Sequence, residues 1–539
     1  MHATRLALSG ALALATLAAA TAQDAAEPIA PHLVVESAGP SGWRTLLGPT
    51  NLGNFLDRDE VRELWQPQTE MILGYLPQLL GDNADVDATR ERLFAFDGLV
   101  RLAVLFDDDE PRFAALSVRG DDADEVAAFT NDLHRLLLAG RDMPRIDVEV
   151  AGQSRPARQA GRDVLTEPIL DGTNAKMLLS RRDGLDVAAG LAAYLDARPI
   201  TLANALPGTP ALTVHVDVDA LIPATEMGED MDIVKALGLD VIDDLTLTLR
   251  AAGPLVEFDC DVRFSGPRRS LVAGLMPEST GVSRLATLVP DGTLGWSVSR
   301  CNLAAVFEGI LDAIETEVDD PRAEMKKEIG FDLEADMLAH LSDELMVIGE
   351  PFDRPETANW SIVFRLPEAE PFRTSLDKLM KAARPLITPL ETVDAAGVPL
   401  RAYGLLAYTT WMGAGNGLFV IGAGRDAEQQ LTAMLTRAKE LDFDAEVEQP
   451  FRDLTRHLPP GLQGVSRIDL DQVLAGPTDL AILMMEEMLM PQLRGPQIDA
   501  ESAAAAQEKL RELLKEYSLS TWRTASGSED GVWRWRLFW

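Results

Sequence analysis

The chain has 539 residues, of which 46% are hydrophobic and 25% charged, as in ordinary folded proteins with room for several core-sized units. Its formal net charge of −37 repels phosphate backbones and anionic lipid surfaces, which argues against nucleic acid as a partner. With 2 cysteines, disulfides cannot be its main support.

The first residues, 1–22, have the pattern of a secretory signal peptide. Arg5 precedes an apolar run over residues 6–20, and Ala20-Thr21-Ala22 supplies the small residues that signal peptidase accepts. We therefore predict cleavage near Ala22 and a periplasmic or extracellular location. An uncleaved N-terminal anchor is the alternative. No later stretch has the roughly 18 to 20 apolar residues that a spanning helix needs, so the mature chain is not expected to cross a membrane.

A long pattern of strands and helices follows and then recurs. In its first occurrence, alternating runs at 99–106 and 113–118 predict a hairpin, and helical spacing follows at 126–138. The same order returns with 345–348, 360–366 and 372–383, and Phe113 then aligns with Trp360. The pattern predicts one unit present in two copies.

A shorter pattern follows each long one. Strand-like runs at 212–218, 245–249 and 256–264 resemble those at 465–470, 519–524 and 532–538, with a helical region after the first run in each case. Hairpins alternating with helices predict an α+β fold of curved antiparallel sheets with helices on one face, duplicated in the order long, short, long, short. The predicted parts are a signal peptide 1–22, long units 23–200 and 283–440, and short units 205–275 and 455–539.

Each of the four units opens with an Asn or Asp at the end of a strand. A short side-chain oxygen at that position can accept a hydrogen bond from the first helical turn. We therefore predict helix N-caps at Asn51, Asp217, Asn302 and Asp469. The alternative is a cation held by Asp217 with Asp219, or by Asp469 with Asp471.

Cys260 and Cys301 are a possible disulfide, because an exported chain is exposed to an oxidising compartment. The alternative is a pair of free thiols, since Cys260 lies on the inward face of an alternating strand, where a thiol packs well.

No residue pattern defines a catalytic, cofactor or metal site. Gly422-Ala423-Gly424 begins a match to the dinucleotide-binding glycine pattern, but a tight turn between strand and helix explains it as well. The five histidines of the mature chain stand apart from one another and from both cysteines, whereas metal sites usually show ligands in local pairs. They are His32, His134, His215, His340 and His457. A Ser-His-Asp triad built from distant residues stays open.

The duplicated pattern, with strand rhythms such as that of residues 343–348, resembles a loose group of uncharacterised exported bacterial proteins. This resemblance implies the architecture alone, because the group has no established activity.

The leading hypothesis is an exported, non-enzymatic scaffold or binding protein of the cell envelope, with an unknown protein or an apolar ligand as its partner. An exported hydrolase with a dispersed catalytic site is the alternative, and a cation-dependent envelope protein is a third possibility. Ligand and oligomeric state do not follow from the sequence.

Overall fold

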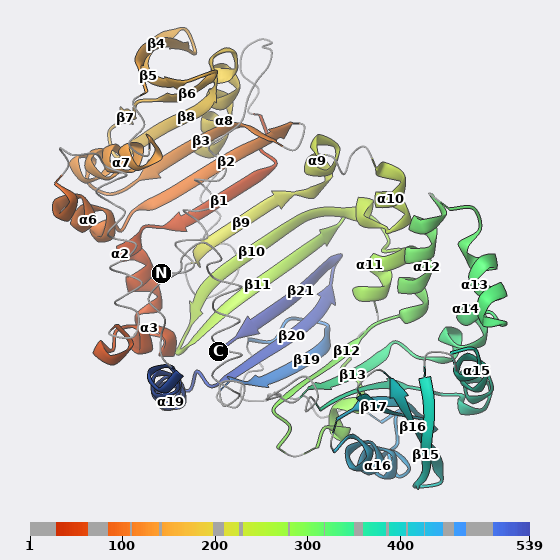
Figure 1. The fold of residues 1–539 in the computed structure, drawn as a ribbon. Coiled ribbons are helices and arrows are strands. Elements are labelled where there is room, and N and C mark those ends of the chain that lie inside the picture. The colour runs from red at the N-terminus through yellow and green to blue at the C-terminus, as the bar shows by residue number, and fades with distance from the viewer. Residues whose placement is uncertain are drawn as a thin grey trace. The chain divides into compact units, whose positions relative to one another are not determined.

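The computed structural model describes residues 29–62, 85–107, 110–138, 143–197, 210–225, 230–278, 281–290, 292–316, 318–349, 359–383, 387–405, 408–424, 426–445, 457–470 and 500–539. The predicted signal peptide lies outside these residues. The chain divides into two compact units, one of residues 1–231 and 242–262 and the other of residues 232–241 and 263–539. Each unit is a mixed α+β structure built on antiparallel strands (Figure 1). The predicted α+β class is confirmed.

The sheet of the first unit runs in the order β4-β5-β6-β8-β3-β2-β1-β9-β10, with β7 also paired to β8. The pairing of β1 with β9 places the predicted first long and first short parts in one sheet. Its strands are β1 (Leu33–Ala38), β2 (Leu99–Asp107), β3 (Glu110–Arg119), β4 (Arg145–Val150), β5 (Gln153–Ala160), β6 (Asp163–Thr166), β7 (Ile169–Asp171), β8 (Asn174–Arg181), β9 (Pro210–Asp217) and β10 (Ile242–Ala252), and β11 (Leu255–Phe264) follows.

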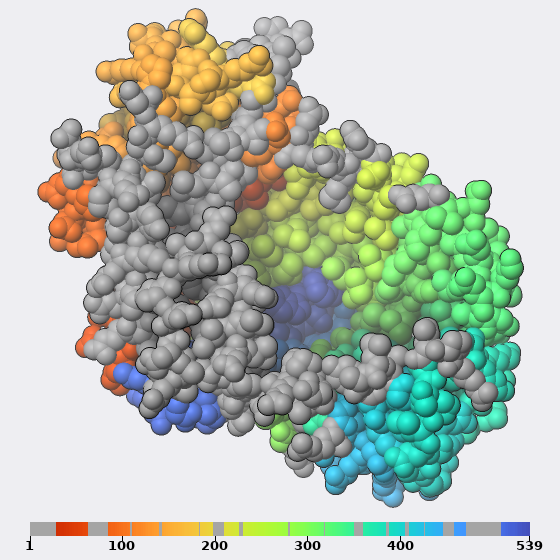
Figure 2. Space-filling model, viewed as in Figure 1, coloured from red at the N-terminus to blue at the C-terminus, as the bar shows by residue number. Residues whose placement is uncertain are grey.

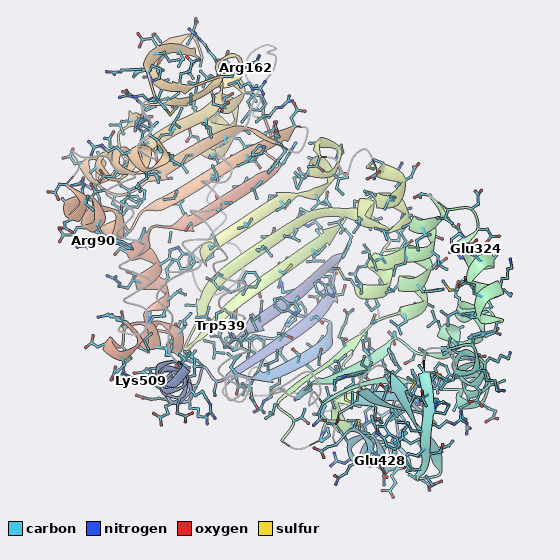
Figure 3. All side chains as sticks on the ribbon, in the orientation of Figure 1. Arg90, Arg162, Glu324, Glu428, Lys509 and Trp539 are labelled. Atoms are coloured by element: carbon cyan, nitrogen blue, oxygen red, sulfur yellow. The ribbon has the colours of Figure 1, made fainter. Side chains whose placement is uncertain are left out.

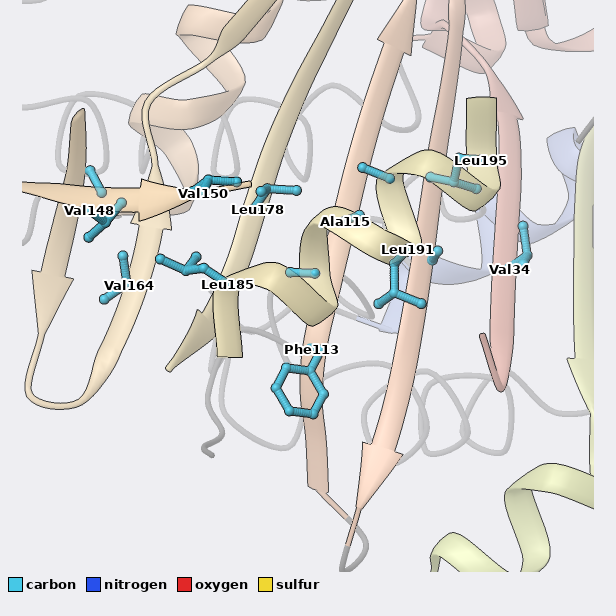
Figure 4. Close-up of a cluster of buried hydrophobic side chains, with 14 residues drawn as sticks. Val34, Phe113, Ala115, Val148, Val150, Val164, Leu178, Leu185, Leu191 and Leu195 are labelled. Atoms are coloured by element: carbon cyan, nitrogen blue, oxygen red, sulfur yellow. The ribbon is translucent and has the colours of Figure 1, made fainter. Parts of the chain in front are cut away.

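The helices of the first unit cover both faces of this sheet, whereas the sequence predicted helices on one face only. They are α2 (Pro40–Leu47), α3 (Asn51–Leu56), α6 (Val86–Ala95), α7 (Ala123–Leu138), α8 (Leu185–Ala197) and α9 (Val218–Leu221), and α10 (Met231–Ala236) follows at the boundary of the unit. Leu185, Leu191 and Leu195 of α8 recur at helical spacing and are buried against Val34 and Phe113 (Figure 4). On the opposite face, α6 and α7 bury a second cluster that contains Val118 and Phe129.

The sheet of the second unit runs in the order β15-β16-β17-β18-β14-β13-β12-β19-β20-β21. Its strands are β12 (Gly295–Arg300), β13 (Glu344–Gly349), β14 (Trp360–Arg365), β15 (Ile387–Ala395), β16 (Val398–Leu405), β17 (Tyr408–Gly415), β18 (Leu418–Ala423), β19 (Leu462–Asp469), β20 (Thr521–Glu529) and β21 (Val532–Phe538). Its helices are α11 (Ser270–Leu275), α12 (Leu303–Glu315), α13 (Pro321–Ile329), α14 (Leu333–Asp336), α15 (Ala369–Ala382), α16 (Ala427–Ala438) and α19 (Ala500–Glu516).

The two strand orders match element for element, from β4 and β15 at one end to β10 and β20. Helices α7 and α15 follow matching strands, as do α8 and α16. Backbone hydrogen bonds at strand ends match too. The pairs are Gly39 N to Gly98 O (2.6 Å) with Cys301 N to Asp343 O (2.5 Å), Gly120 N to Thr173 O (3.1 Å) with Leu366 N to Gly417 O (2.8 Å), and Asp217 N to His32 O (3.0 Å) with Asp469 N to Leu294 O (2.8 Å).

These bonds correct the sequence alignment of the two units by one residue. Gly120 matches Leu366, so Phe113 matches Asn359 and not Trp360. Phe113 faces α8, whereas Trp360 lies on the face of β14 that carries Phe364, next to α15. The apolar pattern alone did not reveal the slip, since both faces of these strands carry apolar residues.

Candidate functional site

An apolar surface on β1, β9 and β10 of the first unit is the strongest candidate for a binding site. Alternation places Leu33 and Val35 of β1 on one face of the sheet, and Val34 and Glu36 on the other. The strands β9 and β10 alternate in the same way, with aliphatic residues on the face of Leu33 and polar residues such as Thr213 opposite.

The pairing register brings these aliphatic residues together in rows across three strands. One row is Leu33, Val216 and Leu245, the next is Val35, Val214 and Leu247, and the third is Ser37, Leu212 and Leu249. We call the eight aliphatic residues of these rows the aliphatic face. From strand and residue spacings, it measures about 10 Å across the strands and about 13 Å along them.

Every residue of the aliphatic face is partly exposed. On the opposite face of β1, by contrast, Val34 and Glu36 are only 2% and 4% exposed. Helix α2 packs against β1, β9 and β10, and Trp43 of α2 donates from Nε1 to Ser37 Oγ at 3.0 Å, in the third row. A soluble sheet normally buries its aliphatic side, so this partly open surface calls for a functional explanation.

The matching surface of the second unit has different chemistry. The register places Gly295, Ser297, Ser466, Thr524 and Ser526 where the first unit has aliphatic side chains. Apolar residues are shared at the positions of Val216 and Leu245, where the second unit has Ile468 and Trp522, 40% and 37% exposed. Trp522 also packs against Trp539, labelled in Figure 3, with ring centroids 5.8 Å apart. The extended aliphatic face is therefore a property of the first unit.

A polar group lies on the other face of the same strands. His215 Nδ1 is 3.1 Å from Thr246 Oγ1, and His32 Nδ1 accepts from the Phe106 amide at 3.2 Å. Burial lowers the pKa of His32, although the negative charge of Asp217 opposes this shift. A neutral His32 is consistent with its role as an acceptor.

Two of the residues predicted as helix N-caps accept a hydrogen bond from the first helical turn. Asp217 accepts from Ala220 N at 2.9 Å at the start of α9, and Asn302 accepts from Ala305 N at 3.2 Å at the start of α12. The cap of α3 is Thr50, which accepts from Gly53 N at 3.0 Å, and not Asn51, which is already the first helical residue. The Thr50 hydroxyl was overlooked because its neighbour has the stronger capping preference.

Asp469 has a different environment from Asp217, although the two occupy matching positions. Arg467 Nη2 approaches both carboxylate oxygens of Asp469 at 3.1 Å, and Thr521 Oγ1 donates to it at 2.8 Å. The segment 471–499, which would contain the helix predicted after Asp469, lies outside the described residues.

The possible disulfide is not formed, because Cys260 and Cys301 are both free thiols. Burial raises the pKa of Cys260 to about 11, with smaller contributions from Asp261 and Asp259. Burial also raises the pKa of Cys301, with a contribution from Asp343. Both are therefore protonated at neutral pH, as expected of packed thiols.

The glycine pattern near residue 422 serves strand packing. A side chain at Gly422 would meet Trp360 O at 2.8 Å, and Gly424 has a φ of 120° in the turn before α16. The preceding strand β18 is paired antiparallel on both sides. A dinucleotide site needs a strand of a parallel sheet here, so the turn interpretation fits the structure.

Within the described part of the chain, no group of three or more His, Cys, Asp and Glu side chains could hold a metal ion. Among the same residues, no helix has both the length and the apolar character needed to cross a membrane.

No protein-family model and no curated protein sequence matches the chain. Three solved structures of TP0453, its crystal forms III, IV and I, are distantly similar, with sequence identities of 9%, 8% and 10% and TM-scores of 0.24, 0.23 and 0.22. They cover 48%, 44% and 45% of this chain and 90%, 81% and 81% of TP0453. Likeness at this level carries no argument about function.

Proposed function

We propose that the protein is an exported, non-enzymatic binding protein of the cell envelope, and that its first unit binds an apolar ligand on the aliphatic face. The observation that carries the proposal is the grid of partly exposed Leu and Val side chains on β1, β9 and β10. Export is proposed from the signal-peptide pattern of residues 1–22.

The chemistry of the aliphatic face favours a hydrocarbon chain. Protein interfaces are enriched in aromatic residues, Met and Arg, whereas this surface consists of Leu and Val alone. The net charge of −37 disfavours docking to an anionic bilayer. We therefore expect a single neutral or zwitterionic lipid, or another aliphatic molecule.

We also infer that the two units arose from one ancestral unit by duplication. The matching strand orders support this inference, as do the matching hydrogen bonds at strand ends. After duplication, the first copy kept or acquired aliphatic residues where the second has Gly, Ser and Thr, so the ligand would belong to the first copy.

The test transfers the chemistry of the second unit to the first. The variant V35S/V214S/L247T gives the middle row the three side chains found at the matching positions of the second unit. These are Ser297, Ser466 and Thr524. Binding of pyrene-labelled phosphatidylcholine to the full chain is measured by fluorescence, and native mass spectrometry identifies copurified lipid. Each buried methylene contributes about 0.8 kcal/mol, so we expect binding to weaken at least about tenfold.

The control is V347S/I468S, which changes two exposed apolar residues of the second unit. It should bind the probe as the unchanged chain does. Equal binding by all three proteins, or no binding and no copurified lipid, would contradict the proposal.

A further inference from the structure

Helix α12 of the second unit is apolar on two sides. Its inner side packs against α11, where a side chain at Gly309 would meet Leu271 N at 2.6 Å and one at Gly274 would collide with Val306 Cγ2. Glycine at both positions lets the two backbones approach closely. Leu311, also on α12, is only 2% exposed.

The outer side of α12 presents a second apolar line. Leu303, Phe307, Ile310 and Ile314 recur at spacings of three and four residues, and Val318 continues the line just beyond the helix. Ile310, Ile314 and Val318 are 43%, 40% and 42% exposed, while Leu303 and Phe307 are partly buried. We call these five residues the outer stripe. The green atoms of this region lie at the surface in Figure 2.

Acidic residues dominate the surroundings of the outer stripe. Glu308, Glu315 and Asp319 are exposed near it, and Glu324 on α13 is exposed at the position labelled in Figure 3. The positive charge of Arg322 is already engaged, because its guanidinium contacts Asp312 at 2.5 Å and also Glu315. Lys326 of α13 pairs with Asp332 at 3.3 Å, and Lys327 is exposed beside it. Acidic residues still outnumber basic ones around the stripe, so its apolar centre lies in a net negative field.

We propose that the outer stripe docks an amphipathic helix of a partner protein whose polar side is basic. Apolar anchors at three- and four-residue spacing match the way in which helices recognise one another, and basic residues beside them would complement the acids. This surface is separate from the aliphatic face, and the proposal does not depend on the lipid.

The charges around the stripe argue against two other partners, a second copy of this chain and a membrane surface. A second copy of this chain would bring the same acidic residues face to face, because a two-fold interface joins identical patches. A membrane-surface helix normally carries Lys and Arg on its polar side, whereas the polar side here has Glu308, Asp312 and Glu315.

The experiment measures the binding of a labelled synthetic helix with a Leu stripe and Lys on its polar side to the full chain by fluorescence anisotropy. A matched peptide with Glu in place of Lys tests the charge. We expect the basic peptide to bind at low salt and to lose affinity as salt rises, and the acidic peptide not to bind. The variant I310Q/I314Q should weaken binding at least about tenfold.

The control variant is L390Q, which removes a 54% exposed leucine on β15 of the same unit. It should bind the basic peptide unchanged, and all proteins should have the same melting temperature. The proposal is overturned if I310Q/I314Q binds like the unchanged chain or if the acidic peptide binds equally well. Binding of the chain to phosphatidylcholine vesicles that I310Q/I314Q abolishes would also overturn it, as would a dimer that the same variant dissociates.

Discussion

Glu36 of β1 and Arg101 of β2 form a buried ion pair, and the matching positions of the second unit hold Val298 and Met346. Arg101 Nε donates to Glu36 Oε1 at 2.7 Å, and the two residues are 6% and 4% exposed. Val298 and Met346 face each other in the same register and are fully buried. One position in the fold thus accepts either a charged or an apolar pair.

This relationship predicts strong coupling between substitutions at the two positions. E36V leaves Arg101 buried without its carboxylate, which should reduce the free energy of unfolding by about 3 to 5 kcal/mol. E36V/R101M recreates the apolar pair of the second unit and should be as stable as the unchanged chain or more so. Urea unfolding measures both, and a double variant no more stable than E36V would refute the prediction.

His134 of α7 should make stability depend on pH. Its side chain is 7% exposed and its Nε2 has no hydrogen-bond partner, and burial lowers the pKa below the ordinary 6.5. The unfolded chain therefore binds a proton more readily, so this contribution is complete above about pH 7 and declines as the pH falls through 6.5 towards the folded pKa.

The variant H134M tests this prediction, because Met380 occupies the matching position of α15. Its melting temperature should fall less between pH 7 and pH 5 than that of the unchanged chain, while its stability at pH 8 need not change. His32, whose pKa is also lowered, leaves a residual slope in both proteins. Identical slopes for the two proteins would show that His134 does not contribute.

Thr50, and not Asn51, should govern the stability of α3. The Thr50 hydroxyl accepts from Gly53 N and donates to Leu47 O at 2.5 Å, and its residue is fully buried. T50A should lower the free energy of unfolding by about 1 to 2 kcal/mol, whereas N51A should change it by less than about 0.5 kcal/mol. T50S retains the hydroxyl and should restore most of the loss. The reverse order of T50A and N51A in chemical denaturation would identify Asn51 as the cap.

The two thiols should be unreactive in the folded protein. With its pKa raised to about 11, Cys260 is ionised at pH 8 in only about one molecule in a thousand, and the thiolate is the form that reacts. Alkylation at pH 8 should be slow until denaturant is added, and then two thiols per chain should react without a reductant. Fewer than two thiols in the unreduced, unfolded chain would reveal a disulfide.

Local pattern was sufficient for much of this fold. Alternating runs and helical spacing predicted the hairpin of β2 and β3, the helices α7 and α15, and the polar residues at Asp217 and Asn302 that begin helices. These features depend on residues within a few positions of one another, so the local sequence is enough to predict them. For α3, the predicted capping residue was wrong by one position, because Thr50 and Asn51 both have side chains that can cap a helix.

Features that depend on pairing between distant strands could not be predicted from the local sequence pattern. The alignment of Phe113 with Trp360 had the right order of elements, but its one-residue slip exchanged the two faces of the strand. Of the three strands that carry the aliphatic face, the sequence predicted only the separate runs at 212–218 and 245–249, and it did not predict β1. Nothing in those runs states that the three strands are neighbours.

The amino-acid order by itself therefore determined the α+β class, the repetition of the elements and several helix starts, because each follows from short-range periodicity and hydrogen bonding. The pairing of β1 with β9, which creates the aliphatic face, and the exposure of the outer stripe on α12 were decided by the packing of the whole chain. Strand neighbours and exposed surfaces result from competition among all apolar faces for burial, and that competition is settled only when the chain is folded.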